Sequence, residues 1–115
     1  MTTVVDYADA IEKAGGSVDL AKDLFGMLLQ ELPVIREQLK LAIENKDHQA
    51  MWDNAHKLYG STAYCGVPLL RVAASEMEAA VKGEEPATIH SQFASLNKAI
   101  EQLIEQGPIY LGEDW

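Results

Sequence analysis

Apolar residues recur at steps of three and four from Leu20 to Ile43, and no other pattern in the chain restricts its fold as strongly. An α-helix turns by about 100° per residue, so this spacing places the apolar side chains on one face. A long helix with such a face has to bury it against other elements. The members of the stripe are Leu20, Leu24, Phe25, Leu28, Leu32, Ile35, Leu39 and Ile43.

Pro33 lies inside this stripe, where a proline removes one backbone hydrogen bond and bends or breaks a helix. The stripe keeps its phase on both sides of Pro33, so we expect one bent helix. Ser17, just before the stripe, is a residue type that caps helix N-termini. The polar segment ENKD at 44–47 ends the pattern.

Glycine and proline divide the rest of the chain into further segments with helical spacing. These segments lack the alternation and the β-branched and aromatic enrichment that are typical of strands. Asp47 is the predicted cap of one helix, and Pro68 and Pro86 lie where proline is tolerated, in the first turn of the next two. The additional helices are expected from Asp6 to Ala14, from Asp47 to about Gly66, from Pro68 to about Gly83 and from Pro86 to about Gln106.

These elements predict an all-α fold. Four long helices with short connections form an up-down-up-down antiparallel four-helix bundle, preceded by one short extra N-terminal helix. A chain of 115 residues can bury one compact core, and no repeat or low-complexity linker divides it. We therefore expect a single domain over residues 1–115, with its core at about 6–106 and an irregular tail at 107–115.

Charge argues against two classes of partner. The formal net charge is −9, and the nine Lys and Arg residues are scattered through the chain. Nucleic acid and anionic membranes both require a basic surface, so neither is an expected partner. The N-terminus has no signal-peptide pattern, and no apolar run approaches the roughly 18 residues of a membrane span, so we expect a cytoplasmic protein. Cys65 is the only cysteine and is expected to be a buried, reduced thiol.

The segment AHKLYGSTAYCG, residues 55–66, places a histidine on the outer face of its helix. His56 points away from the predicted core-facing positions. Gly60 follows on the same face, although glycine inside a helix costs about 1 kcal/mol relative to alanine. Either the missing side chain gives another molecule access to the imidazole, or His56 is an ordinary surface residue and Gly60 a helix-packing contact. The core-facing positions of this helix are Met51, Ala55, Leu58, Thr62 and Cys65.

The same segment resembles the signature of histidine phosphotransfer (Hpt) domains, Ala-His-x-Leu-Lys-Gly-Ser/Ala followed by a small residue and a second glycine. The segments LLQELPVIREQL upstream and LLRVAASEMEAAVKGEE downstream follow the layout of that family, so the resemblance covers about residues 6–106. The stretch HKLYGSTAYCGVPLLR is most similar to the C-terminal phosphotransfer modules of tripartite hybrid sensor kinases of the BarA/GacS type. The matching positions are Ala55, His56, Lys57, Leu58, Gly60, Ser61 and Gly66.

The resemblance implies a phosphocarrier in a two-component phosphorelay. His56 is the expected phosphoacceptor, which takes a phosphoryl group from the aspartyl phosphate of a receiver domain in a hybrid sensor kinase and passes it to an aspartate of a response regulator. The chain has no glycine-rich phosphate loop and no clustered acidic motif, so it is expected to have no kinase or ATP-binding machinery. No cofactor of its own is expected, because the receiver brings the Mg²⁺. As an isolated domain it is expected to be a monomer, either free or as the cytoplasmic C-terminal module of a membrane-bound sensor kinase.

Four residues are candidates to support the phosphoryl group. Lys57 has a long stem that can bring its ammonium group toward His56. Gly60 clears space. Tyr59 stands where the family often has a second lysine, and its hydroxyl can donate a hydrogen bond but carries no charge. Glu78 stands where relatives often have a glutamine that bonds the active histidine. A carboxylate can accept from the imidazole N–H and also repels a phosphoryl group, and the sequence leaves open which effect is larger.

A docking surface for the partner is expected around His56. A small apolar patch with a polar rim fits a transient complex of modest area. Asp53 is also a candidate to orient the histidine ring, although an exposed carboxylate on a helix face often has no such role. The expected members are Trp52, Asp53, Tyr59, Ala63 and Tyr64 near the histidine and Tyr7 and Ile11 on the short first helix.

Two other classes of function are open to a helical bundle. A helical adaptor or inhibitor would bind a signalling protein through the same face without modification of His56. A bundle that holds a metal or cofactor needs inward-facing Glu and Glu-x-x-His sets, and this chain has no Glu-x-x-His motif. His48 and His90 match no local metal-ligand spacing with His56, so we expect them at the surface and predict no metal site.

Overall fold

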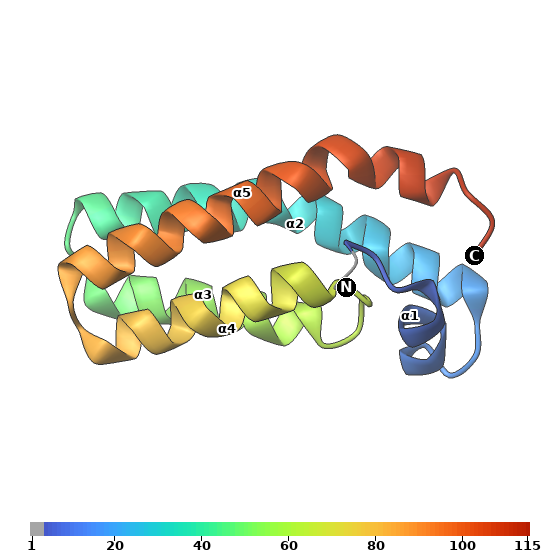
Figure 1. Ribbon diagram of the computed structural model, residues 1–115, viewed down its shortest axis with the longest axis horizontal. Coiled ribbons are helices and arrows are strands. Elements are labelled where there is room, and N and C mark those ends of the chain that lie inside the picture. The colour runs from blue at the N-terminus through green and yellow to red at the C-terminus, as the bar shows by residue number, and fades with distance from the viewer. Residues whose placement is uncertain (1–3) are drawn as a thin grey trace.

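The computed structural model describes residues 4–115, which form five α-helices and no β-strand (Figure 1). α2 packs against α3 and α5, and α4 packs against the same two helices, so the four long helices form an antiparallel bundle. α1 packs against the N-terminal half of α2. The all-α prediction is therefore confirmed. The helices are α1 (Tyr7–Lys13), α2 (Val18–Glu44), α3 (His48–Thr62), α4 (Pro68–Gly83) and α5 (Pro86–Leu111).

The predicted N-termini of the helices are confirmed. Asp6, Ser17 and Asp47 are the N-caps of α1, α2 and α3, and each side-chain oxygen accepts a hydrogen bond from the backbone N–H three residues later, at 3.0 to 3.1 Å. Pro68 and Pro86 lie in the first turn of α4 and α5, where a helix does not need their missing N–H. No helix within residues 4–115 is long and apolar enough to cross a membrane.

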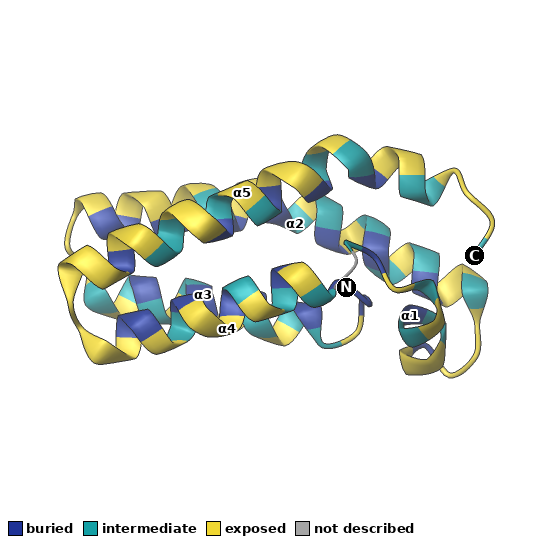
Figure 2. Cartoon of the chain, viewed as in Figure 1, coloured by how far each residue is buried: buried dark blue, intermediate teal, exposed yellow. Residues whose placement is uncertain are grey.

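α2 continues through Pro33 as one helix. The ring of Pro33 lies on the exposed side, and the buried face keeps its phase on both sides of it. The start of the predicted stripe is less buried than expected. Leu20 is 46% exposed and Leu24 is partly buried, so the buried face begins at Ala21. Figure 2 shows the same division in every long helix, with buried residues on the inner side and exposed residues on the outer side.

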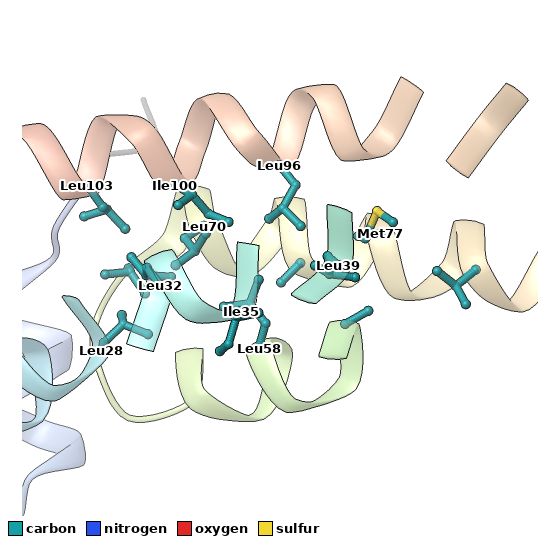
Figure 3. Packing of buried hydrophobic residues seen from close by; sticks show 14 of the residues in the cluster. Leu28, Leu32, Ile35, Leu39, Leu58, Leu70, Met77, Leu96, Ile100 and Leu103 are labelled. Atoms are coloured by element: carbon teal, nitrogen blue, oxygen red, sulfur yellow. The ribbon is translucent and has the colours of Figure 1, made fainter. Parts of the chain in front are cut away.

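The core lies between the four long helices, where large aliphatic side chains from each helix meet (Figure 3). Each fully buried leucine or isoleucine contributes about 1.5–3 kcal/mol relative to an exposed one, so this core is the main source of stability. The five positions from Met51 to Cys65 that the helical spacing assigns to the core are all buried, although Cys65 lies just beyond the end of α3. The residues labelled in Figure 3 are Leu28, Leu32, Ile35, Leu39, Leu58, Leu70, Met77, Leu96, Ile100 and Leu103.

α3 ends at Thr62 and not near Gly66, which corrects the predicted boundary. Gly66 has a φ of +60°, and its carbonyl accepts a hydrogen bond from the backbone N–H of Asp6 at 2.8 Å. A Cβ at this position would clash with the carbonyl oxygen of Asp6 and would lie 2.8 Å from the Cβ of Ala10. The chain therefore leaves the helix early so that the backbone of Gly66 can pack directly against the start of α1.

α5 extends to Leu111, so the prediction of an irregular tail from Gly107 is wrong for residues 107–111. Pro108 lies inside the helix, where it cannot donate the usual backbone hydrogen bond. Gly107 compensates through packing, because it is buried against α2 so closely that an added Cβ would lie 2.5 Å from Cδ2 of Leu29. This close contact between helices holds the last turns of α5 in place.

Residues 112–115 fold back over α1 and the N-terminal half of α2. The indole N–H of Trp115 donates to the carbonyl oxygen of Tyr110 at 2.8 Å, and the hydroxyl of Tyr7 donates to the carboxylate of Glu113 at 2.9 Å. The ring of Trp115 lies 5.0 Å from that of Tyr7 and 5.6 Å from that of Phe25. Burial, together with the hydrogen bond to Glu113, raises the pKa of Tyr7 to about 12. An aromatic cluster thus closes this end of the molecule.

Candidate functional site

His56 lies on the outer face of α3, as the helical spacing predicts. Its side chain is 64% exposed, whereas the neighbouring Ala55 and Leu58 are completely buried. Its Nδ1 atom lies 3.3 Å from Oε1 of Glu78 on α4. Within residues 4–115, its Nε2 atom has no hydrogen-bond partner. The histidine therefore has one nitrogen held by the fold and one nitrogen available to another molecule.

Glu78 decides which nitrogen carries the hydrogen. An ionised carboxylate can only accept hydrogen bonds, so its contact with Nδ1 assigns a hydrogen to Nδ1, and in the neutral ring the lone pair then lies on Nε2. The side chain of Glu78 is 21% exposed, and its second oxygen, Oε2, is buried with no partner in the described part of the chain. Within residues 4–115, the imidazole is thus the only hydrogen-bond contact of the Glu78 carboxylate.

Trp52 lies one turn before His56 and stacks on its ring. The ring centroids are 5.4 Å apart, and the planes differ by 12°. Side chains in a helix lean toward its N-terminus, so a residue lies over the side chain four positions earlier. The sequence places Trp52 on the predicted docking surface but does not show that the indole contacts the imidazole.

Gly60 lies one turn after His56 and is exposed. A Cβ built at Gly60 meets no atom within 4 Å, so this glycine is not a helix-packing contact. A larger side chain at position 60 would lean back over His56 in the way that His56 leans over Trp52. Glycine therefore leaves the second face of the imidazole open.

Tyr59 faces α4 and packs against an arginine that the sequence analysis missed. The guanidinium carbon of Arg71 lies 4.5 Å from the centroid of the Tyr59 ring, and Nη2 of Arg71 donates to the tyrosine hydroxyl at 3.1 Å. Arg71 also donates to Oγ1 of Thr62 at 3.4 Å. The antiparallel pairing of α3 and α4 brings these residues together, and a register inferred from that pairing is the signal that could have found Arg71.

Lysine side chains that could stabilise a phosphoryl group lie on both sides of α3. A hollow between α3 and α4 is lined by Trp52, Glu78 and Lys82, among others, and Lys82 is a second residue that the sequence analysis missed. Lys57 lines a different hollow, between α2 and α3, together with Glu31. The structure thus places Lys57 on the side of α3 that faces α2, away from Glu78.

The remaining residues of the predicted docking surface divide into two groups. Asp53 is exposed, and its carboxylate accepts a hydrogen bond from the side chain of Gln49 at 2.9 Å. Ala63 and Tyr64 follow at the end of α3, where Tyr64 is 60% exposed. The other two predicted members lie on α1 and take part in its packing. Tyr7 belongs to the aromatic cluster, and Ile11 packs against the buried alanines of α1 and α2.

The other histidines are placed as predicted. The side chain of His48 is 43% exposed and lies 3.5 Å from the carboxylate of Glu84, and His90 is exposed. No group of three or more His, Cys, Asp and Glu side chains in residues 4–115 is arranged to hold a metal ion.

Comparison with known proteins identifies the family. Residues 23–106 match the model of the Hpt domain. The chain is 39% identical over 100 residues to the sensor protein GacS of Pseudomonas syringae pv. syringae, a match that covers 87% of this chain and 11% of that protein. It is 36% identical over 67 residues to the signal transduction histidine-protein kinase BarA of Escherichia coli (strain K12), which covers 58% of this chain and 7% of that protein.

The fold gives the same result. The crystal structure of the HPT domain from a sensor hybrid histidine kinase of Shewanella superposes with a TM-score of 0.73 and 27% sequence identity, over 96% of this chain and 97% of that one. The chain belongs to the Hpt domain family and acts in histidine phosphotransfer within a phosphorelay. In hybrid kinases, such domains work with receiver domains. The chain spans about a tenth of the length of the sensor kinases it matches.

Proposed function

We propose that His56 is the residue that carries the phosphoryl group. It accepts the group from the aspartyl phosphate of a receiver domain in a hybrid sensor kinase and passes it to an aspartate of a response regulator. One observation supports this assignment above the others: the imidazole is 64% exposed, while its Nδ1 is held by Glu78. Nε2 is then the nucleophilic nitrogen, and the open side at Gly60 gives it room to react.

In the transfer step, the lone pair of Nε2 attacks the phosphorus atom of the aspartyl phosphate. The N–P bond forms as the bond from phosphorus to the aspartate oxygen breaks, and the aspartate leaves as a carboxylate. The hydrogen on Nδ1 stays in place, so the phosphorylated ring is a cation beside the carboxylate of Glu78. Transfer onward reverses these bond changes. Such a reaction depends chiefly on placement of the groups and on charge stabilisation, so a small helical scaffold is sufficient.

The receiver supplies the Mg²⁺ and a lysine of its own to the phosphoryl oxygens, and this chain supplies no cofactor. Lys57 and Lys82 lie on the two sides of α3 and can offset part of the added negative charge. The receiver docks on the outer face of α3, over Trp52, Tyr59 and Tyr64. The domain works as a monomer in the cytoplasm, as a separate protein or as a module of a sensor kinase.

The test is incubation with a receiver domain that is phosphorylated on its aspartate. We expect a label on this chain that is stable in alkali and labile in acid, as a phosphohistidine is. His56→Gln should abolish the label, and the matched control His48→Gln, which changes a surface histidine at the start of the same helix, should retain it. Equal labelling of wild type and His56→Gln would refute the assignment. An adaptor would bind the receiver with and without His56 and would carry no label.

A further inference from the structure

We propose that Trp52 is a positioning residue for phosphotransfer: its indole fixes the plane of the His56 ring so that Nδ1 meets Glu78 and Nε2 faces the incoming phosphoryl group. This inference rests on the proposed role of His56. It assigns to Trp52 a role in the histidine's own reactivity, separate from any contact with the partner.

The exposed ring of His56 needs such a restraint. An imidazole on a helix surface can rotate about the bond between Cβ and Cγ, and a rotation by half a turn exchanges Nδ1 with a carbon atom. The contact with Glu78 is 3.3 Å long, which is longer than a strong hydrogen bond, so by itself it restrains the ring only weakly. The stacked indole restricts the ring to one plane, and Glu78 then selects which edge of the ring faces α4.

Trp52 can act as a platform because the fold holds it in place. It is partly buried and packs against the hydrophobic core, unlike His56 itself. It also lines the hollow between α3 and α4 that contains Glu78. The two groups that restrain the imidazole are therefore both anchored to the bundle, one beneath the ring and one at its edge.

Stacking also suits the charge that develops on the ring. Phosphorylation at Nε2 makes the imidazole a cation, and the face of an indole attracts cations. The charged groups near His56 are Asp53 and Lys57 on α3 and Glu78 and Lys82 on α4, and a change at Trp52 leaves all four in place. With one face covered by Trp52 and one edge by Glu78, the Nε2 edge and the face on the side of Gly60 are the parts of the ring that stay open to the receiver.

The experiment removes the partner so that docking cannot contribute. Phosphoramidate, a small phosphodonor, is used to phosphorylate wild type, Trp52→Leu and Trp52→Phe. We expect Trp52→Leu to react about tenfold more slowly, because misplacement of a reacting group costs this much or more, and Trp52→Phe to stay within about twofold of wild type. Trp115→Leu, which removes the other tryptophan from the cluster with Tyr7 and Phe25, is the matched control and should react like wild type.

A second measurement does not depend on phosphorylation. Nitrogen-15 NMR of His56 should show the hydrogen on Nδ1 in wild type and Trp52→Phe and a mixture of the two tautomers in Trp52→Leu. Trp52→Met replaces Trp52→Leu if circular dichroism shows that the leucine variant is unfolded. A wild-type tautomer together with a wild-type rate of reaction with phosphoramidate in the non-aromatic variant would overturn the proposal. If no protein becomes labelled, the role of His56 as phosphoacceptor fails, and the NMR result still decides whether Trp52 positions the ring.

Discussion

Two glycines in the same twelve-residue segment, Gly60 and Gly66, have different roles in the molecule. Gly60 has ordinary helical geometry, is exposed, and has open space where a Cβ would be. Gly66 has a positive φ, is buried, and lies directly against the backbone of Asp6. A side chain at Gly60 would obstruct a partner protein that approaches His56, whereas a side chain at Gly66 would disturb the fold itself. A motif that is matched as one unit therefore contains one residue for access and one for assembly.

The largest effect is expected at Gly66. Gly66→Ala forces a non-glycine residue into the left-handed region, which costs about 1–2 kcal/mol, and its Cβ clashes with the start of α1, which adds a similar amount. We expect the free energy of unfolding to fall by about 3 kcal/mol in urea denaturation. A loss below about 1 kcal/mol would mean that α1 can move away from the loop at little cost, and the contrast between the two glycines would disappear.

Gly60 should respond in the opposite direction. Gly60→Ala removes the cost of a helical glycine and meets no neighbour, so we expect stability to rise by up to about 1 kcal/mol. Gly60→Leu should also fold, but its side chain would cover the open face of His56 and slow transfer from a phosphorylated receiver by about tenfold or more. Stability is measured by urea denaturation and transfer by the appearance of labelled protein. A leucine variant that transfers at the wild-type rate would show that this face is not the approach route.

Cys65 lies next to Gly66, in the connection between α3 and α4. We expect a smaller effect there, on the chemical reactivity of the Cys65 thiol. Its thiol is buried and donates hydrogen bonds to the carbonyl oxygens of Ser61 at 3.4 Å and Leu24 at 3.6 Å. Burial raises the pKa of Cys65 from 9.0 to about 11. Between pH 9 and 11, the thiol of Cys65 therefore stays protonated in the folded state, whereas it loses its proton in the unfolded state. The contribution of Cys65 to the free energy of unfolding is present in full below pH 9 and is lost as the pH rises toward 11.

We expect iodoacetamide at pH 8 to modify Cys65 at least about tenfold more slowly in the folded protein than in urea, because the thiolate is the reactive form. Gly66→Ala should raise the folded-state rate by loosening the connection between α3 and α4, and Gly60→Ala should leave it unchanged. Equal rates in both variants would indicate that the strain at Gly66 does not reach its neighbour.

The fold was predictable where local chemistry determines it. The side chains of Asp6, Ser17 and Asp47 bond to backbone groups only one turn away, so the starts of these helices are visible in the sequence. The two errors in helix boundaries come from contacts between distant segments. α3 ends early because Gly66 meets Asp6, and α5 runs long because Gly107 meets Leu29, and neither approach is encoded in periodicity.

The site divides in the same way. The outward direction of His56 and the burial of its neighbours follow from the angle between successive residues, so they were predictable. The stacking of Trp52 depends on the rotamers of two side chains, and the contact of Arg71 with Tyr59 depends on the register between α3 and α4. Neither contact follows from the spacing within one helix. Glu78 could be singled out from the sequence only because a family resemblance pointed to its position.

The partly buried carboxylate of Glu78 makes this site a place where stability and activity conflict. Removing a carboxylate from water costs free energy, and an apolar residue of similar size would avoid that cost. The same substitution would leave His56 without the carboxylate that accepts the hydrogen bond from its Nδ1. Selection for thermal stability alone should therefore favour variants that have lost Glu78. Such variants should transfer the phosphoryl group poorly.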